Sequence, residues 1–156
     1  MILIFDNLIS ENQANYCIEK AMSSKPTIEH HGRFCYSNEQ LFMQDEPFRD
    51  IMGSIISQAK EISNLLEVDW SEINYWPSGS HHVLHQDTAS IQTTFASITY
   101  LNVNYRGGET YFEDGTTISP QVGRTVFFDG IKYKHGVRSI CHGERFTLPI
   151  WYKTID

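Results

Sequence analysis

The sequence predicts an α+β fold in which two helices precede a β-sandwich or barrel. Apolar residues recur at helical intervals in the first half of the chain, whereas the second half holds short segments rich in β-branched and aromatic residues. Turn residues separate those segments, as in all-β sandwiches and barrels. Because the helices come first and the strands later, an alternating α/β sheet is not expected.

The first helix is expected to begin after Ser10 and to end before Pro26. Ser10 and Gln13 have the spacing of a capping box, in which each side chain caps the backbone N–H of the other residue. Apolar side chains then follow at helical intervals at Ala14, Cys17, Ile18 and Ala21. The polar stretch 27–44 is expected to form a loop or short hairpin, for which a role as a lid is open.

The second helix is expected to begin at Asp45, which can cap it, with Pro47 in its first turn. An apolar stripe with spacings of three and four residues follows over about five turns: Phe48, Ile51, Met52, Ile55, Ile56, Ala59, Ile62, Leu65 and Leu66. We expect this stripe to pack on the sheet.

Strands are expected from Trp70 onward, at residues 72–76, 93–104, 109–112, 124–128, 136–140 and 145–152. Turn signals such as Gly107-Gly108 and Asp129-Gly130 separate them. We therefore assign about 1–68 to helical support and about 69–154 to a β core, within a single domain spanning 1–156.

Composition excludes several classes of protein. The 156 residues are 40% apolar and 20% charged, which suits a packed core. Acidic residues outnumber basic ones by 19 to 12, and the net charge of −7 argues against broad nucleic-acid binding. The sequence contains no apolar run of about 18 residues, so no membrane span is expected. The N-terminus lacks the basic and apolar regions of a signal peptide. Three widely spaced cysteines predict reduced thiols and a cytoplasmic protein.

The segment His85-Gln86-Asp87 is the first candidate for chemistry. On a strand, residues two apart point to the same side, so this imidazole and this carboxylate would share a face. His135 follows a plausible strand and the Asp129-Gly130 turn. Two histidines and one carboxylate on one face of an octahedral ion leave three positions open, as in non-haem Fe(II) oxygenases.

Arg145 follows His135 by ten residues. If the two flanking strands are neighbours, its guanidinium points into the same cavity as the metal ligands. A guanidinium presents a planar fork of donors that matches a carboxylate. A metal with open positions and a deeper arginine suit a 2-oxo acid that carries a distal carboxylate.

The chain at this point resembles a known family, the 2-oxoglutarate- and Fe(II)-dependent dioxygenases, and within it the prolyl 4-hydroxylase-like branch. The resemblance covers about 74–152 and rests on the order and spacing of these residues: Tyr75, His85-Gln86-Asp87, Tyr100-Leu101-Asn102, Gly107-Gly108-Glu109-Thr110, Gly123, His135, Gly143, Arg145 and Trp151.

The resemblance implies a role for individual residues. The iron ligands would be His85, Asp87 and His135. Arg145 would bind the distal carboxylate of 2-oxoglutarate, and the hydroxyl of Tyr100 would share it. Tyr75 would lie near the iron-chelating end of the co-substrate, and Thr147, two residues beyond Arg145, would add a hydroxyl contact.

The resemblance also implies the fold and the reaction. The β core would be a double-stranded β-helix, which is a jelly-roll or cupin-like architecture. Fe(II) would be the metal, with 2-oxoglutarate and O₂ as co-substrates and ascorbate as an admissible reductant. The enzyme would hydroxylate a C–H bond and release succinate and CO₂. A prolyl residue in a peptide or protein is the first candidate substrate, with another amino-acid side chain or a small molecule as the alternative.

The sequence departs from the family pattern in three places. An arginine stands at the spacing where most relatives of this branch have a lysine. The usual glycine between Tyr75 and His85 is displaced by one residue. The chain is also short for a prolyl hydroxylase and leaves little room for a large peptide-binding domain.

Four residues are candidates for the substrate mouth: Arg33, Tyr36, Trp76 and Arg138. Core filling is the alternative for the two aromatic residues. Loop residues His30 and His31 are further candidates for substrate contact. His82 lies an odd number of residues before His85, so a regular strand would direct it to the opposite face. A place at the surface or beside the metal ligands is expected for it, rather than metal ligation.

Two other functions compete with an oxygenase. A non-catalytic β-sandwich that keeps its metal for structure would more often have a closed site of four ligands. A zinc hydrolase would share the ligands but leave Arg145 and Tyr100 unexplained, and no HExxH helix is present.

Overall fold

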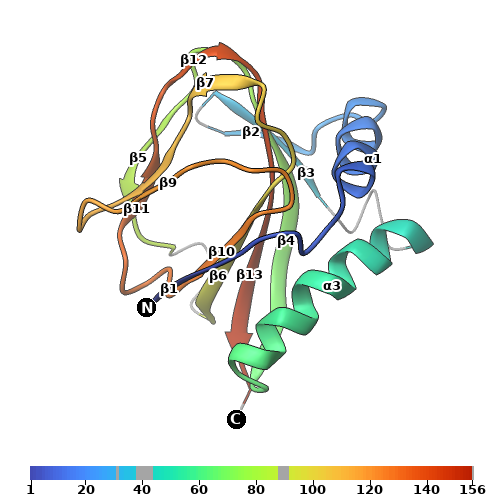
Figure 1. The fold of residues 1–156 in the computed structure, drawn as a ribbon, viewed down its shortest axis with the longest axis vertical. Coiled ribbons are helices and arrows are strands. Elements are labelled where there is room, and N and C mark those ends of the chain that lie inside the picture. Colours follow the sequence, from blue (N-terminus) through green and yellow to red (C-terminus); the bar gives the residue numbers. More distant parts are fainter. Residues whose placement is uncertain (31, 38–43, 88–91, 156) are drawn as a thin grey trace.

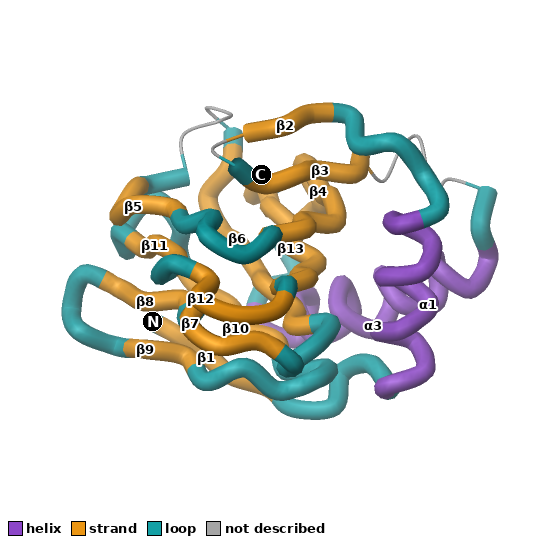
Figure 2. The backbone as a smooth tube through the Cα atoms, turned by 90° about the horizontal axis from the view of Figure 1, so that it is seen from above, coloured by secondary structure: helices purple, strands orange, loops and turns teal. Residues whose placement is uncertain are grey.

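The computed structural model describes residues 1–30, 32–37, 44–87 and 92–155. Two sheets face each other, and two helices cover the outer side of the larger sheet (Figure 1). Viewed from above, both helices gather on one side of the strands (Figure 2). The α+β prediction is therefore confirmed. None of the described helices is long and apolar enough to cross a membrane.

The larger sheet contains β1 (Ile2–Phe5), β2 (Ile28–His30), β3 (Arg33–Ser37), β4 (Leu66–Trp76), β6 (Thr93–Tyr100), β10 (Thr125–Phe128) and β13 (Arg145–Thr154). Their order across the sheet is β1-β10-β6-β13-β4-β3-β2. The smaller sheet contains β5 (His82–His85), β8 (Thr110–Phe112), β9 (Thr117–Ile118) and β11 (His135–Val137), in the order β5-β11-β8-β9. β7 (Tyr105–Gly107) and β12 (Ile140–Gly143) form a separate pair.

The helices α1 (Glu11–Met22) and α3 (Glu46–Ile62) begin where the sequence predicts. Ser10 and Gln13 form the expected capping box on α1. Asp45 caps α3 through Phe48 N–H and also accepts hydrogen bonds from Lys20 Nζ at 2.8 Å and Tyr16 Oη at 2.6 Å. The N-terminus of α3 is thereby tied to α1.

Two apolar layers result from the alternation of side chains along the strands. The outer layer lies between the helices and the larger sheet, and includes Ile51, Ile55, Phe127, Leu148 and Ile150. The inner layer lies between the two sheets, and its buried members are Ala96, Tyr100, Phe112, Ile118, Val126 and Phe128. Other inward positions of β4 and β13 carry polar side chains. These side chains point into the space between the two sheets.

The structure corrects the expected composition of the first 68 residues. They supply helices, but also β1, which pairs with β10 at one edge, and β2 and β3, which extend the other edge beside β4. The short apolar run of β1 carries no period that identifies a strand, because it lacks alternation. Part of stretch 27–44 is a hairpin, as one of the two options proposed; residues 31 and 38–43 lie outside the described residues.

Candidate metal centre and adjoining cavities

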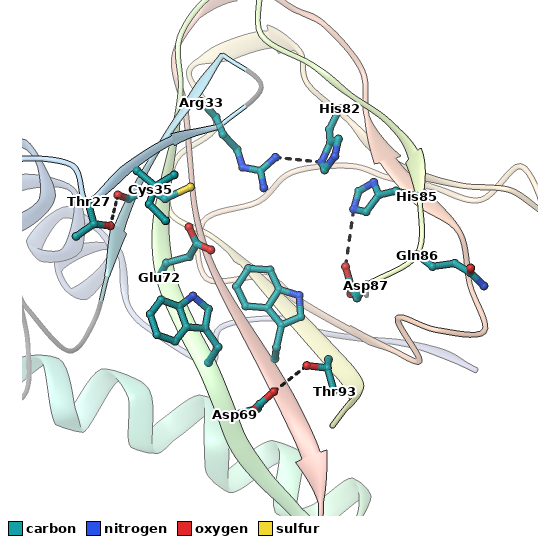
Figure 3. Close-up of a pocket in the computed structure, with 13 residues that line it drawn as sticks. Thr27, Arg33, Cys35, Asp69, Glu72, His82, His85, Gln86, Asp87 and Thr93 are labelled. Atoms are coloured by element: carbon teal, nitrogen blue, oxygen red, sulfur yellow. Dashed lines mark hydrogen bonds and ion pairs between the residues drawn. The ribbon is translucent and has the colours of Figure 1, made fainter. Parts of the chain in front are cut away.

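The structure brings His85, Asp87 and His135 together. His85 ends β5 and His135 begins β11, where the two residues face each other in the strand register. One ligand atom from each of the three residues lies within 4.8 Å of the others. Asp87 Oδ1 is 3.2 Å from His135 Nε2 and 3.8 Å from His85 Nε2. Figure 3 shows His85 directed toward Asp87 at one wall of a cavity.

Backbone carbonyls orient both imidazoles. His85 Nδ1 lies 2.8 Å from the carbonyl of Val83, and His135 Nδ1 lies 3.0 Å from the carbonyl of Tyr133. An Nδ1–H that donates to a carbonyl leaves the Nε2 lone pair free for a metal. Burial lowers the pKa of His85, which favours the neutral, ligating form.

The donor set fits a divalent transition metal. Asp87 is 8% exposed, and its Oδ2 is buried without a hydrogen-bond partner among the described residues. A buried carboxylate oxygen of this kind is costly unless a cation meets it. Two imidazoles and one carboxylate leave open coordination positions, which distinguishes the group from a closed four-ligand structural site.

Gly130 lies directly against the Asp87 carboxylate. The backbone N–H of Asp87 donates to the carbonyl of Gly130 at 2.9 Å. A Cβ placed on Gly130 would lie 2.2 Å from Asp87 Oδ2. The carboxylate therefore reaches its position only because residue 130 has no side chain.

Gly130→Ala is expected to weaken metal binding, because the new methyl group must displace the Asp87 carboxylate. We predict a loss of about 10- to 100-fold in metal affinity, the usual range when a group that orients a ligand is altered. Isothermal titration with Mn²⁺ measures it. The matched control is Gly53→Ala on α3, where a Cβ meets no atom within 4 Å. Equal Mn²⁺ affinity for the two variants would contradict this role of Gly130.

His82 lies beside the metal centre, one of the two positions expected for it, but on the face of His85 rather than on the opposite face. The pairing of β11 with β5 shifts between His135 and Val137, and this bulge moves His82 to the face of His85. The two imidazole rings stack with centroids 3.7 Å apart. His82 Nδ1 also lies 3.0 Å from Nη1 of Arg33.

Arg145 is completely buried near the metal centre. Its Nη2 donates to Thr110 Oγ1 at 2.9 Å, and its guanidinium lies 5.1 Å from the ring of Trp76 and 5.5 Å from that of Tyr100. Among the described residues, Nε and Nη1 have no hydrogen-bond partner at bonding distance and angle, and no acidic side chain pairs with this charge. The Tyr105 hydroxyl lies near enough for the Arg145 charge to oppose the rise that burial causes in the pKa of Tyr105. A buried, unpaired guanidinium is unfavourable by itself and suits an anionic ligand.

A narrow cavity of about 50 Å³ connects Arg145 with the metal centre. Its lining includes all three predicted ligands together with Arg145, Thr147 and Asn74. Tyr100 packs against the guanidinium and donates to Thr110 Oγ1 at 2.6 Å. Thr110 and Asn74 were not predicted as site residues. The inward alternation of β8 and β4 is the signal that would have found them.

Tyr75 lies on the wrong side of the sheet for its predicted role. Its ring packs against Phe34 and Phe146 in the outer layer, and its hydroxyl donates to Glu144 at 2.6 Å. Trp76 occupies the inward position instead and lines the narrow cavity. The glycine displaced by one residue in this segment explains the error, because a shift of one residue exchanges the faces of a strand.

We expect Trp76→Leu, but not Tyr75→Phe, to weaken 2-oxo-acid binding in the narrow cavity. The leucine removes the aromatic face beneath the Arg145 guanidinium, a desolvated cation–π contact whose loss corresponds to about tenfold in affinity. Tyr75→Phe removes only the hydrogen bond to Glu144 on the far face. Titration of both variants with 2-oxoglutarate measures the difference. A larger loss of 2-oxoglutarate affinity in Tyr75→Phe than in Trp76→Leu would contradict this assignment and support Tyr75 as a site residue.

Of the four residues expected at the substrate mouth, two line the cavities and two lie elsewhere. Arg33 and Trp76 line the cavities. Tyr36 is 5% exposed in the outer apolar layer and fills the core, because β3 directs it away from the site. Arg138 is exposed and lies over the ring of Tyr111 at 4.8 Å, on the outer face of the smaller sheet. His31 lies outside the described residues, as does the side chain of His30.

A larger cavity of about 720 Å³ adjoins the metal centre. Figure 3 shows Cys35 and Glu72 on one wall and His82, His85 and Asp87 on the opposite wall. Arg33 reaches between the two walls toward His82. The metal centre therefore adjoins a narrow cavity that contains the Arg145 guanidinium and a wider cavity on its other side.

Comparisons with known proteins agree with this site. A family model for the 2OG-Fe(II) oxygenase superfamily matches residues 71–153. Prolyl 3-hydroxylase 1 of Rattus norvegicus and of Homo sapiens are each 36% identical over 69 residues, which cover 40% of this chain and 9% of theirs. The chain therefore matches only about 9% of the length of these curated relatives.

Two solved structures share the fold. The viral collagen prolyl hydroxylase of Paramecium bursaria Chlorella virus-1, in its 2OG complex, superposes with a TM-score of 0.80 at 18% identity, over 99% of this chain and 96% of that one. A prolyl-4-hydroxylase of Pseudomonas putida gives 0.78 at 17% identity, over 99% and 93%. The expected double-stranded β-helix with supporting helices is thereby confirmed.

Proposed function

Since this chain belongs to the 2OG-Fe(II) oxygenase superfamily, we propose that it hydroxylates a C–H bond of an amino-acid residue with Fe(II), 2-oxoglutarate and O₂. A prolyl residue in a peptide or protein is the first candidate substrate. The second candidate is another amino-acid side chain or a small molecule. Family and metal-ligand group together imply Fe(II) and 2-oxoglutarate as the cofactor and co-substrate.

The unpaired guanidinium of Arg145 is the observation that carries this proposal. It ends the same narrow cavity that begins at His85, Asp87 and His135. A dicarboxylate with a 2-oxo group fits this arrangement, since one end can chelate a metal while the other pairs with the arginine. A metal that served only a structural role would not explain why the Arg145 guanidinium is buried next to it without an anionic partner.

The chain positions its ligands and excludes water. When bound, Fe(II) supplies the oxidising chemistry by which 2-oxoglutarate and O₂ become succinate and CO₂ and a substrate C–H becomes C–OH. Trp76 and Tyr100 both pack against the Arg145 guanidinium, which restricts its orientation and keeps solvent from it. The backbone carbonyls behind His85 and His135 hold their Nε2 atoms toward the metal.

The prolyl candidate is supported by the relatives' names. Prolyl 3-hydroxylase 1, a collagen prolyl hydroxylase and a prolyl-4-hydroxylase are among the similar proteins. A prolyl hydroxylase of Trichoplax adhaerens, solved with a peptide fragment, shares the fold with a TM-score of 0.80 at 14% identity. These likenesses make peptides the first substrates to assay.

The test is an incubation of the protein with Fe(II), 2-oxoglutarate, O₂ and a peptide library. We expect succinate release that depends on Fe(II), together with peptides that gain one oxygen atom in mass spectrometry. Modified prolines would support the first candidate, and oxygen on other residues the second. Protein that binds neither Fe(II) nor 2-oxoglutarate and releases no succinate would overturn the proposed function.

A further inference from the structure

Glu72 places a buried carboxylate in the wide cavity. It lies on β4, with its side chain on the same inward face as Asn74 and Trp76, and it is only 9% exposed. Its Oε2 is buried and has no hydrogen-bond partner among the described residues. Burial raises the pKa of Glu72, and hydrogen bonding to Cys35, the charge of Arg33 and hydrogen bonding to Trp70 oppose that rise. A polar atom buried at this cost inside a cavity indicates a missing partner.

The charge of Arg33 acts on Glu72, but Arg33 forms no ion pair with it among the described residues. Arg33 Nη1 lies 3.0 Å from His82 Nδ1, and the guanidinium stacks over the Trp76 ring at 4.9 Å. A second carboxylate, Asp69, lines the same cavity and accepts a hydrogen bond from Thr93 at 2.9 Å. Among the described residues that line this cavity, and apart from the metal ligands, two carboxylates accompany one guanidinium.

Aromatic rings complete this wall. Trp70 and Trp151 are directly paired across β4 and β13, and both line the cavity. Trp70 is 42% exposed, so part of its indole surface is open to a ligand. Indole faces attract cations, and the attraction grows where water is excluded. A carboxylate next to two indoles is therefore a favourable environment for an ammonium group.

We propose that the wide cavity binds a protonated amine of the substrate, with Glu72 as its acceptor and the indoles of Trp70 and Trp151 beside it. The inference rests on the proposed function, because the same cavity leads to the metal centre. It names the substrate class: an amine-bearing molecule, such as a peptide with a basic side chain at or next to the oxidised residue. Glu72 is then a specificity-determining residue.

Two matched probes test this inference without knowledge of the natural substrate. N-acetyl-lysine N-methylamide carries an ammonium group, whereas N-acetyl-norleucine N-methylamide has the same carbon chain without it. Isothermal titration, under nitrogen and with Fe(II) and 2-oxoglutarate present, gives both affinities for the wild-type chain. We expect the lysine probe to bind about tenfold more tightly or better, since a desolvated carboxylate favours a charged donor. Added salt should reduce that preference.

Glu72→Gln should remove the preference for the lysine probe while keeping the side-chain volume. The matched control is Glu61→Gln, an exposed residue of α3 that changes the net charge equally. Equal affinities of the two probes for the wild-type chain would overturn the inference, and this comparison needs no variant. A preference that survives in Glu72→Gln would also overturn the assignment of Glu72.

Failure of this inference and failure of the proposed function are distinguishable. Fe(II) and 2-oxoglutarate binding is titrated in the same samples before a probe is added. Normal binding of both with no preference between the probes rejects the amine site alone. A preference for the lysine probe in a chain that binds neither Fe(II) nor 2-oxoglutarate rejects the oxygenase proposal and the catalytic use of the amine site.

Discussion

Asp87→Ala is expected to reduce succinate release to the level of a sample without protein. Asp87 is the only carboxylate in the described three-residue metal-ligand group, and its Oδ1 lies 3.2 Å from His135 Nε2. Without it, two neutral imidazoles remain to hold a divalent ion, and the positive charge of that ion loses its only counter-charge within the group. Metal titration and a succinate assay measure the two losses together.

The fold of Asp87→Ala should remain intact, because the substitution removes a buried carboxylate whose Oδ2 has no hydrogen-bond partner among the described residues. Circular dichroism and the melting temperature of the metal-free protein check this. Asp50→Ala, an exposed residue of α3, is the matched control and should keep full turnover. Fe(II)-dependent turnover of Asp87→Ala equal to that of the control would refute the metal assignment.

Arg145→Gln is expected to raise the concentration of 2-oxoglutarate needed for half-maximal turnover by about 100-fold, while Fe(II) affinity changes little. Each hydrogen bond from a charged donor contributes about 1.5–3 kcal/mol, and Nε and Nη1 are two nitrogen atoms of Arg145 without a hydrogen-bond partner among the described residues. Loss of two such bonds corresponds to about 3 kcal/mol or more, which is a factor of about 100. Turnover assays over a range of co-substrate concentrations measure the change.

The stability of Arg145→Gln separates a binding role from a structural one. A structural ion pair would leave an unpaired partner after the substitution, but the described residues contain no acidic partner for Arg145. We therefore expect the melting temperature of the ligand-free variant to stay near that of the wild type. 2-Oxoglutarate with Mn²⁺ should stabilise the wild type more than the variant. Arg49→Gln, exposed on α3, is the charge-matched control.

The helices and the metal ligands were predictable because their signals are local. A capping box, a capping aspartate and an apolar stripe identify α1 and α3 without reference to the rest of the chain. The spacing of His85 and Asp87 likewise places two ligands on one face. His135 was harder, since only the pairing of β11 with β5 brings it opposite His85.

Errors arose where one residue decides the face of a strand. The displaced glycine exchanges Tyr75 with Trp76, and the bulge in β5–β11 brings His82 beside His85. Arg138 fails for a similar reason: it follows β11 and lies over Tyr111 outside the smaller sheet. The displaced glycine was visible in the sequence, whereas residue spacing alone contains no information on the bulge between β5 and β11.

The wide cavity was unpredictable for a different reason. Glu72 is one polar residue in a strand, and its significance depends on burial, an unpaired oxygen and indoles from two strands. These features exist only after β4, β13 and the β2–β3 hairpin have assembled. Likewise, the sequence does not distinguish Thr110 from other strand residues. Only the folded structure shows that its hydroxyl accepts hydrogen bonds from both Arg145 and Tyr100.

Equilibrium binding of labelled 2-oxoglutarate, measured without oxygen and with or without Fe(II), tests the central claim most directly. We predict one bound molecule per chain in the presence of Fe(II), and far weaker binding when Fe(II) is withheld or Arg145 is replaced by glutamine. The claim requires both ends of the co-substrate to be held, one by the metal and one by the arginine. Absence of binding to the Fe(II)-loaded wild type, or binding that needs neither Fe(II) nor Arg145, would contradict it.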